Sequence, residues 1–146
     1  MTASKHFALT TAIVALFTAS PALAGGRVFQ NRTHPLATGV ASQIHVNLGV
    51  SNPEAIQITG APVDWTTEIE IVVKTRATAN AAAEAVSDAI WVDLYARVMA
   101  DRSLGGRVQQ LTPGDAIFDD DQAEVGVSRL TWRFTVQHRT DSNSIS

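Results

Sequence analysis

Residues 128–139 read SRLTWRFTVQHR, and this stretch decides the fold class. Apolar residues occupy every second position from Leu130 to Val136, and polar or basic residues stand between them. This period of two predicts a β-strand with one buried and one solvated face, the usual pattern of antiparallel sheets. Trp65 to Arg76 alternates in the same way, with Val72 as the exception on its polar face.

Weaker extended segments surround these two strands. They are residues 27–30, 43–48, 55–59 and 107–111, separated by predicted turns or loops at 31–42, 51–54, 60–62, 112–114 and 119–121, where Gly, Pro, Asn and Asp gather. The sequence thus predicts a mainly antiparallel sheet of about five or six strands.

Two helices complete the predicted fold. Residues 78–101 carry an apolar row at helical spacing, with Thr78 or Asn80 as the cap; the row is Ala82, Val86, Ile90, Leu94 and Val98, with Ala85 and Ala89 beside it. Trp91 and Tyr95 form a neighbouring ridge that suits the core or an interface. The other helix is predicted over residues 4–20, with Ser4 as its cap. Its apolar face holds Phe7, Val14 and Phe17, with Ile13 and Leu16 beside it.

The first 24 residues also have the parts of a secretory signal. A weakly basic start precedes an apolar stretch, and Ala22-Leu23-Ala24 provides an A-x-A cleavage site. One feature favours a retained helix: Leu23-Ala24-Gly25-Gly26-Arg27-Val28 follows it, much as Leu104-Gly105-Gly106-Arg107-Val108 follows the other helix. The paired glycines suit left-handed helix exits. We therefore expect one α+β domain over residues 1–146, with a polar tail at 141–146.

Composition narrows the function classes. The chain has 146 residues, 45% of them hydrophobic, a net charge of −3 and no cysteine. There is no basic excess for nucleic-acid binding, no polybasic run for an anionic membrane, and no thiolate chemistry.

Motifs for catalysis or metal binding are missing. The four histidines are scattered over a helix, a loop and two strands, without the spacing of a zinc site. Asp119, Asp120, Asp121 and Glu124 lack the ordered spacing of a calcium loop, so a solvated acidic loop is favoured. We expect no enzyme activity, no cofactor and no metal.

The order of short motifs resembles the tail terminator family of long-tailed phages, which includes the minor tail U proteins. The residues that carry the resemblance span nearly the whole chain: Leu23–Val28, Asn31-Arg32, His34–Leu36, Gly60–Pro62, Asp64-Trp65, Val98–Asp101, Leu104–Gly106, Leu130–Val136 and His138–Thr140. The resemblance implies a small α+β domain that assembles as a hexameric ring on the finished tail tube. Such a ring stops tube growth and forms the surface that joins the head.

The resemblance also implies partners and a location. The partners are further copies of the chain, the tail tube protein and the head–tail connector, with DNA only passing through the lumen and no membrane contact. The protein is then assembled in the host cytoplasm and carried in the virion tail of a phage, prophage or gene transfer particle. The alternative is a secreted or periplasmic binding domain cleaved near Ala24.

Closed rings arise from head-to-tail contacts between different surfaces of neighbouring copies. The candidate surfaces are the acidic loop Asp119-Asp120-Asp121 and the arginines expected on solvated strand faces, namely Arg76, Arg129 and Arg133. We expect the acidic loop of one subunit to contact the arginine face of the next, although a merely solvated turn fits the sequence nearly as well.

Overall fold

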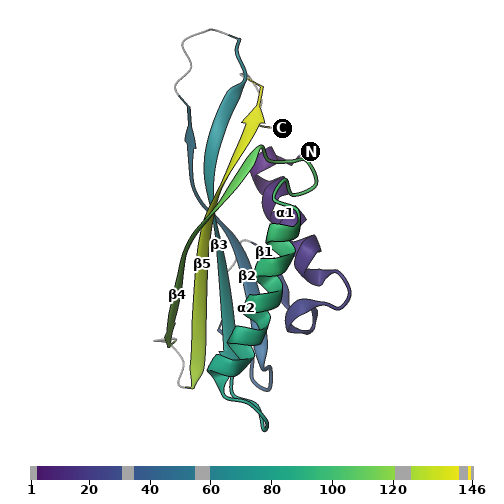
Figure 1. Ribbon diagram of the computed structural model, residues 1–146, viewed down its shortest axis with the longest axis vertical. Helices are drawn as coiled ribbons and strands as arrows, with labels where there is room; N and C mark the ends of the chain where they lie inside the picture. Colours follow the sequence, from purple (N-terminus) through teal and green to yellow (C-terminus); the bar gives the residue numbers. More distant parts are fainter. Residues whose placement is uncertain (1–2, 31–34, 55–59, 121–125, 142–144, 146) are drawn as a thin grey trace.

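The computed structural model describes residues 3–30, 35–54, 60–120, 126–141 and 145. In chain order it contains helix α1 (Lys5–Thr18), the 3-10 segment η1 (Leu23–Gly26), strands β1 (Val28–Gln30), β2 (Ser42–Pro53) and β3 (Val63–Arg76), helix α2 (Ala83–Ala100), and strands β4 (Gln110–Asp120) and β5 (Val127–Thr140). The strands form one sheet in the order β1-β2-β3-β5-β4. Among the described strands, only β1 and β2 pair in parallel. Both helices lie on the same side of this sheet (Figure 1), so the predicted α+β class is confirmed.

The core fills the space between the helices and the sheet. Leu9, Ile13 and Phe17 of α1 are at most 1% exposed, and Leu94 of α2 is fully buried. They pack in one cluster with the apolar face of the central strands, which includes Trp132 of β5. The alternate apolar residues by which β3 and β5 were predicted are therefore the ones that pack against the helices.

Two predicted turns are strand instead. Residues 51–53 belong to β2, which resumes its pairing with β3 after a register shift between Leu48 and Ser51. Residues 112–114 belong to β4, where a bulge between Pro113 and Ala116 absorbs the turn-like sequence. At Gly114 an added Cβ would lie 2.5 Å from the carbonyl oxygen of Arg133, so only glycine permits this close approach to β5. The predicted strand 55–59 and the motif residues Asn31, Arg32 and His34 lie outside the described residues.

The helix boundaries and faces also need correction. Helix α2 begins at Ala83, because the Thr78 hydroxyl accepts from the backbone of Asn80 and Ala81 and so forms a turn before the helix. The alanines at 82, 85 and 89 are exposed, while Ala83 and Ser87 are buried.

In α1 the Ser4 cap is confirmed by its hydrogen bond from the Phe7 N–H at 3.1 Å. Phe7 itself is 44% exposed. The buried row runs through Leu9, Ile13 and Phe17. The predicted burial of Phe17 is therefore confirmed, and that of Phe7 is wrong, because the buried face is centred nearer to Ile13.

The two helix exits share one backbone conformation. Ala24, Gly25 and Gly26 have φ values of 51°, 61° and 83°, and residues 104, 105 and 106 have φ values of 49°, 72° and 83°. Three consecutive left-handed residues turn the chain back toward the sheet in each case. Glycine takes this conformation without strain, which explains the paired glycines that the sequence repeats.

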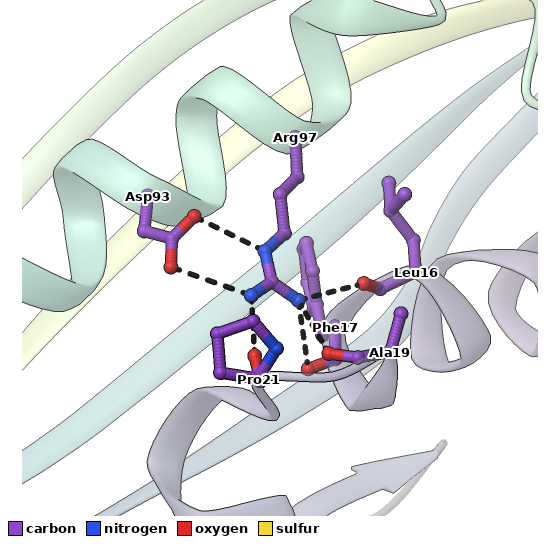
Figure 2. Close-up of polar contacts among 6 residues, drawn as sticks. All are labelled: Leu16, Phe17, Ala19, Pro21, Asp93 and Arg97. Atoms are coloured by element: carbon purple, nitrogen blue, oxygen red, sulfur yellow. Dashed lines mark hydrogen bonds and ion pairs between the residues drawn. The ribbon is translucent and has the colours of Figure 1, made fainter.

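Arg97 of α2 holds the end of α1 (Figure 2). Its Nη1 donates to the carbonyl oxygens of Leu16, at 3.0 Å, and Ala19, at 3.1 Å, and more weakly to that of Phe17. Nη2 donates to the carbonyl oxygen of Pro21, and Nε pairs with Asp93 at 3.1 Å. The guanidinium thus satisfies carbonyl groups that the last turn of a helix leaves without partners.

Candidate functional site

The structure places the predicted acidic residues at the end of an edge strand. Asp119 and Asp120 are the last residues of β4, opposite Arg129 and Ser128 of β5. Their prediction as a loop was wrong, because strand pairing continues to Asp120. Asp121, like Glu124, lies outside the described residues.

Each predicted interface arginine has a partner within its own chain. Arg129 pairs with Asp119 at 3.3 Å, and Arg133 pairs with Glu70 at 3.1 Å. Arg76 donates to the carbonyl oxygens of residues 37 and 40, and so fastens the segment before β2. The structure therefore brings one acidic and one basic candidate together inside a single copy.

The pairs of Arg129 and Arg133 lie on the sheet face opposite the helices. A shallow hollow of about 260 Å³ on this face is lined by Glu70, Val72, Lys74, Ile117, Asp119, Arg129, Thr131 and Arg133. The lining holds two carboxylates, Glu70 and Asp119, and three cations, Lys74, Arg129 and Arg133, so its net charge is +1. The ion pairs of Arg129 and Arg133 are exposed, and pairs of this kind contribute about 0–1 kcal/mol each. This face therefore has little net charge to attract a partner.

An acidic surface lies where α2 begins. A hollow of about 480 Å³ is lined by Glu84, Ser87, Asp88, Phe118, Asp119, Asp120, Ser128 and Arg129. Within the described part of the chain, no ion pair engages Glu84, Asp88 or Asp120. Phe118 is 64% exposed beside them. We call Glu84, Asp88, Phe118, Asp119 and Asp120 the acidic end.

A basic surface lies at the opposite end of α2. A groove of about 400 Å³ is lined by Lys5, Ala8, Gly106, Arg107, Val108, Gln109 and Arg139, and Arg102 lines the adjoining hollow. We call Lys5, Arg102 and Arg107 the basic end. Figure 1 shows that the start of α2 lies near the lower end of the sheet, whereas the loop after α2 lies in the upper half, beside α1.

Local contacts fix the shape of the basic end. Lys5 Nζ donates to the Arg139 carbonyl oxygen at 3.1 Å, and Arg107 Nη1 donates to that of Leu104 at 2.9 Å. Arg139 is neutralised by Asp64 at 2.7 Å, and that contact lowers the pKa of the Asp64 carboxyl. This surface could not be predicted from the sequence, because Lys5 lies far from Arg102 and Arg107 in the chain.

The structure also joins two of the histidines that look scattered in the sequence. The rings of His6 and His138 lie 4.7 Å apart. His6 Nε2 lies 3.0 Å from the Ser51 hydroxyl, which lies 2.7 Å from that of Thr67, and Thr67 lies 2.7 Å from His138 Nε2. Burial, with smaller contributions from the charges of His6 and Lys5, lowers the pKa of His138 to about 4.

This network joins α1 to β2, β3 and β5. His138 is 1% exposed, and its Nδ1 has no hydrogen-bond partner within the described residues. A neutral, buried imidazole is a poor proton acceptor at neutral pH. The arrangement therefore fits a structural role better than acid–base chemistry.

Other kinds of site find no support in the described residues. No group of three or more His, Asp or Glu side chains among them is placed to hold a metal ion. None of the helices described is long and apolar enough to cross a membrane.

The comparisons with known proteins concern the fold. No protein-family model and no curated protein matches the chain. Among solved structures, the chain is similar to a chain from the virion of a native gene transfer agent (GTA) particle, with a TM-score of 0.59 and 18% sequence identity. The likeness covers 90% of this chain and 95% of that one. The shared architecture therefore extends over nearly all of both chains.

Proposed function

We propose that this chain is a non-catalytic assembly protein, the tail terminator of a long-tailed phage, a prophage or a gene transfer particle. It caps the completed tail tube as a ring, stops further polymerisation and forms the surface on which the head is joined. The observation that carries the proposal is the fold likeness over nearly all of both chains to a chain of a gene transfer agent virion. Because a shared fold alone does not assign function, the surfaces of this chain provide the second line of support.

Those surfaces suit assembly better than catalysis. The charged groups at the acidic end and the basic end lie in open hollows. His6, which is half-buried, and His138, which is buried, take part in the network that joins α1 to the sheet. A ring-forming subunit requires two different exposed surfaces that meet between neighbours, and this chain has two such surfaces of opposite charge.

The proposal includes a partner set. Further copies of the chain form a ring, expected to be a hexamer, and the ring contacts the tail tube protein on one side and the head–tail connector on the other. DNA passes through the lumen, and no membrane takes part. Assembly in the host cytoplasm and incorporation into the virion tail follow from this role.

The alternative is a secreted binding domain cleaved after Ala24. Cleavage there would remove all of α1, and with it Leu9, Ile13 and Phe17 from the core. The packing of α1 therefore favours the terminator proposal over the secreted domain.

The direct biochemical test uses the purified chain and its tail tube protein. We expect the chain, added during tube polymerisation, to shorten the tubes in a dose-dependent way and to be seen by electron microscopy at one tube end only. Labelling along the whole tube, or tube lengths that do not change with dose, would contradict the proposal.

A further inference from the structure

The fold leaves charged side chains at both ends of α2 without a counterion. Glu84, Asp88 and Asp120 of the acidic end form no ion pair with any described residue, and the same is true of the basic end. Asp101, which precedes Arg102, accepts hydrogen bonds from the Ser103 hydroxyl and from the N–H groups of Gly105 and Ser103, and these lower its pKa. Its carboxylate offsets one of the three positive charges of the basic end, which leaves a net charge of +2. Each surface thus keeps a net charge of its own.

We propose that the acidic end of one copy docks into the basic end of the next copy. This deepens the proposed function and rests on it for its biological meaning, because it names the contact through which the ring closes. The occupant is a second copy because three carboxylates without counterions at one end match three such cations at the other, Lys5, Arg102 and Arg107. No other source of complementary charge is required.

An exposed aromatic residue adds to the charge match. Phe118 is 64% exposed at the centre of the acidic end, on an edge strand whose outer side has no paired strand in the described structure. Aromatic side chains surrounded by charged groups are typical of protein interfaces. The aromatic side chain is buried at the centre of the contact, and the charged groups lie at its rim. The docked copy covers Phe118, and the charges set its register.

The geometry makes the contact head-to-tail. The two surfaces lie at opposite ends of α2 and are different from each other, so each copy uses one surface on each neighbour (Figure 1). Such contacts yield a closed ring or an open filament, according to the rotation between neighbours. This contact replaces the arginine face as partner of Asp119 and Asp120, since Arg129 and Arg133 are already paired within the chain.

The test is a charge swap in the full-length chain, followed by sedimentation velocity at low and high salt. We expect Arg107→Glu and Asp120→Arg each to weaken self-association at least tenfold. The double variant, which restores opposite charges across the same contact, should recover most of the loss. High salt should weaken the wild-type association, because exposed charges are screened.

Arg133→Glu is the matched control, because it changes the same charge on the open sheet face. We expect its self-association to equal that of the wild type, with thermal melting to verify that every variant folds. A wild-type chain that stays monomeric at its highest soluble concentration in low salt overturns the proposal. So does loss of association in Arg133→Glu but not in Arg107→Glu, or a double variant as weak as the singles.

The two proposals fail in different ways. Self-association is measured without tube or head. If the single charge variants weaken association and the double variant restores it, but tail lengths in the cell equal those of the wild type, the terminator role is refuted and the contact is kept. Loss of tail-length control in the cell, with charge swaps that have no effect on association, would keep the role and refute the contact.

Discussion

Replacing Arg97 with Gln tests how α2 holds the N-terminal helix. The guanidinium donates to the carbonyl oxygens of residues 16, 17, 19 and 21, and its side chain is only 15% exposed. Hydrogen bonds to charged groups contribute about 1.5–3 kcal/mol each, but bonds that share one donor group are not additive. A glutamine amide cannot span the same set of carbonyls. We therefore expect Arg97→Gln to lower the free energy of unfolding by about 2–3 kcal/mol.

The assay is urea denaturation followed by circular dichroism, with Arg133→Gln as the matched control. Arg133 loses only one ion pair, to Glu70, and its side chain is 49% exposed, so that variant should differ from the wild type by at most about 1 kcal/mol. For a domain of this size the Arg97→Gln loss corresponds to a fall in Tm of about 4–12 °C. Equal stabilities of the two variants would refute the role assigned to Arg97.

Three further predictions follow from the same structure. Leu94→Ala should lower the free energy of unfolding by about 2–5 kcal/mol, because Leu94 is fully buried. Val92 is 63% exposed, so Val92→Ala should change it by no more than about 0.5 kcal/mol. Equal urea midpoints for the two variants would show that the helix faces are misassigned. The pKa of His138 is about 4 in the folded chain and 6.5 in the unfolded chain. Its contribution to the free energy of unfolding is therefore complete above pH 6.5, and about 3 kcal/mol is lost as the pH falls to 4. His138→Gln should flatten the dependence of stability on pH between 4 and 6.5, and an unchanged slope would count against this assignment. The intact mass of the chain from its native host should include α1, while a product that starts at Gly25 would favour the secreted domain.

The alternating strands and the helix exits could be predicted because each depends on local pattern. Every second residue of β5 from Leu130 to Val136 is buried. The repeated Gly-Gly pairs do mark left-handed exits. These features follow from neighbouring residues alone, so no tertiary information is required.

The errors arose where tertiary contacts override local preference. Residues 112–114 have the composition of a turn, yet pairing with β5 keeps them in β4 as a bulge. Phe7 is as apolar as Phe17, but α1 is anchored so that only Phe17 enters the core. The side on which a helix packs depends on the sheet beneath it, which a helical pattern alone does not specify.

The candidate site was predicted only on its acidic side. Asp119 and Asp120 are adjacent in the sequence, so their charge was visible there. The basic end combines Lys5, from the start of the chain, with Arg102 and Arg107 from the loop after α2. Its assembly depends on the packing of α1 beside that loop, and no spacing in the sequence predicts it.

The most direct test of the terminator role is the distribution of tail lengths in particles from a strain that lacks this chain. Electron micrographs of its lysates should show overlong tails without heads, and a plasmid copy of the wild-type gene should restore tails of one length joined to heads. Tails of normal length carrying heads in the absence of the chain would contradict the central claim.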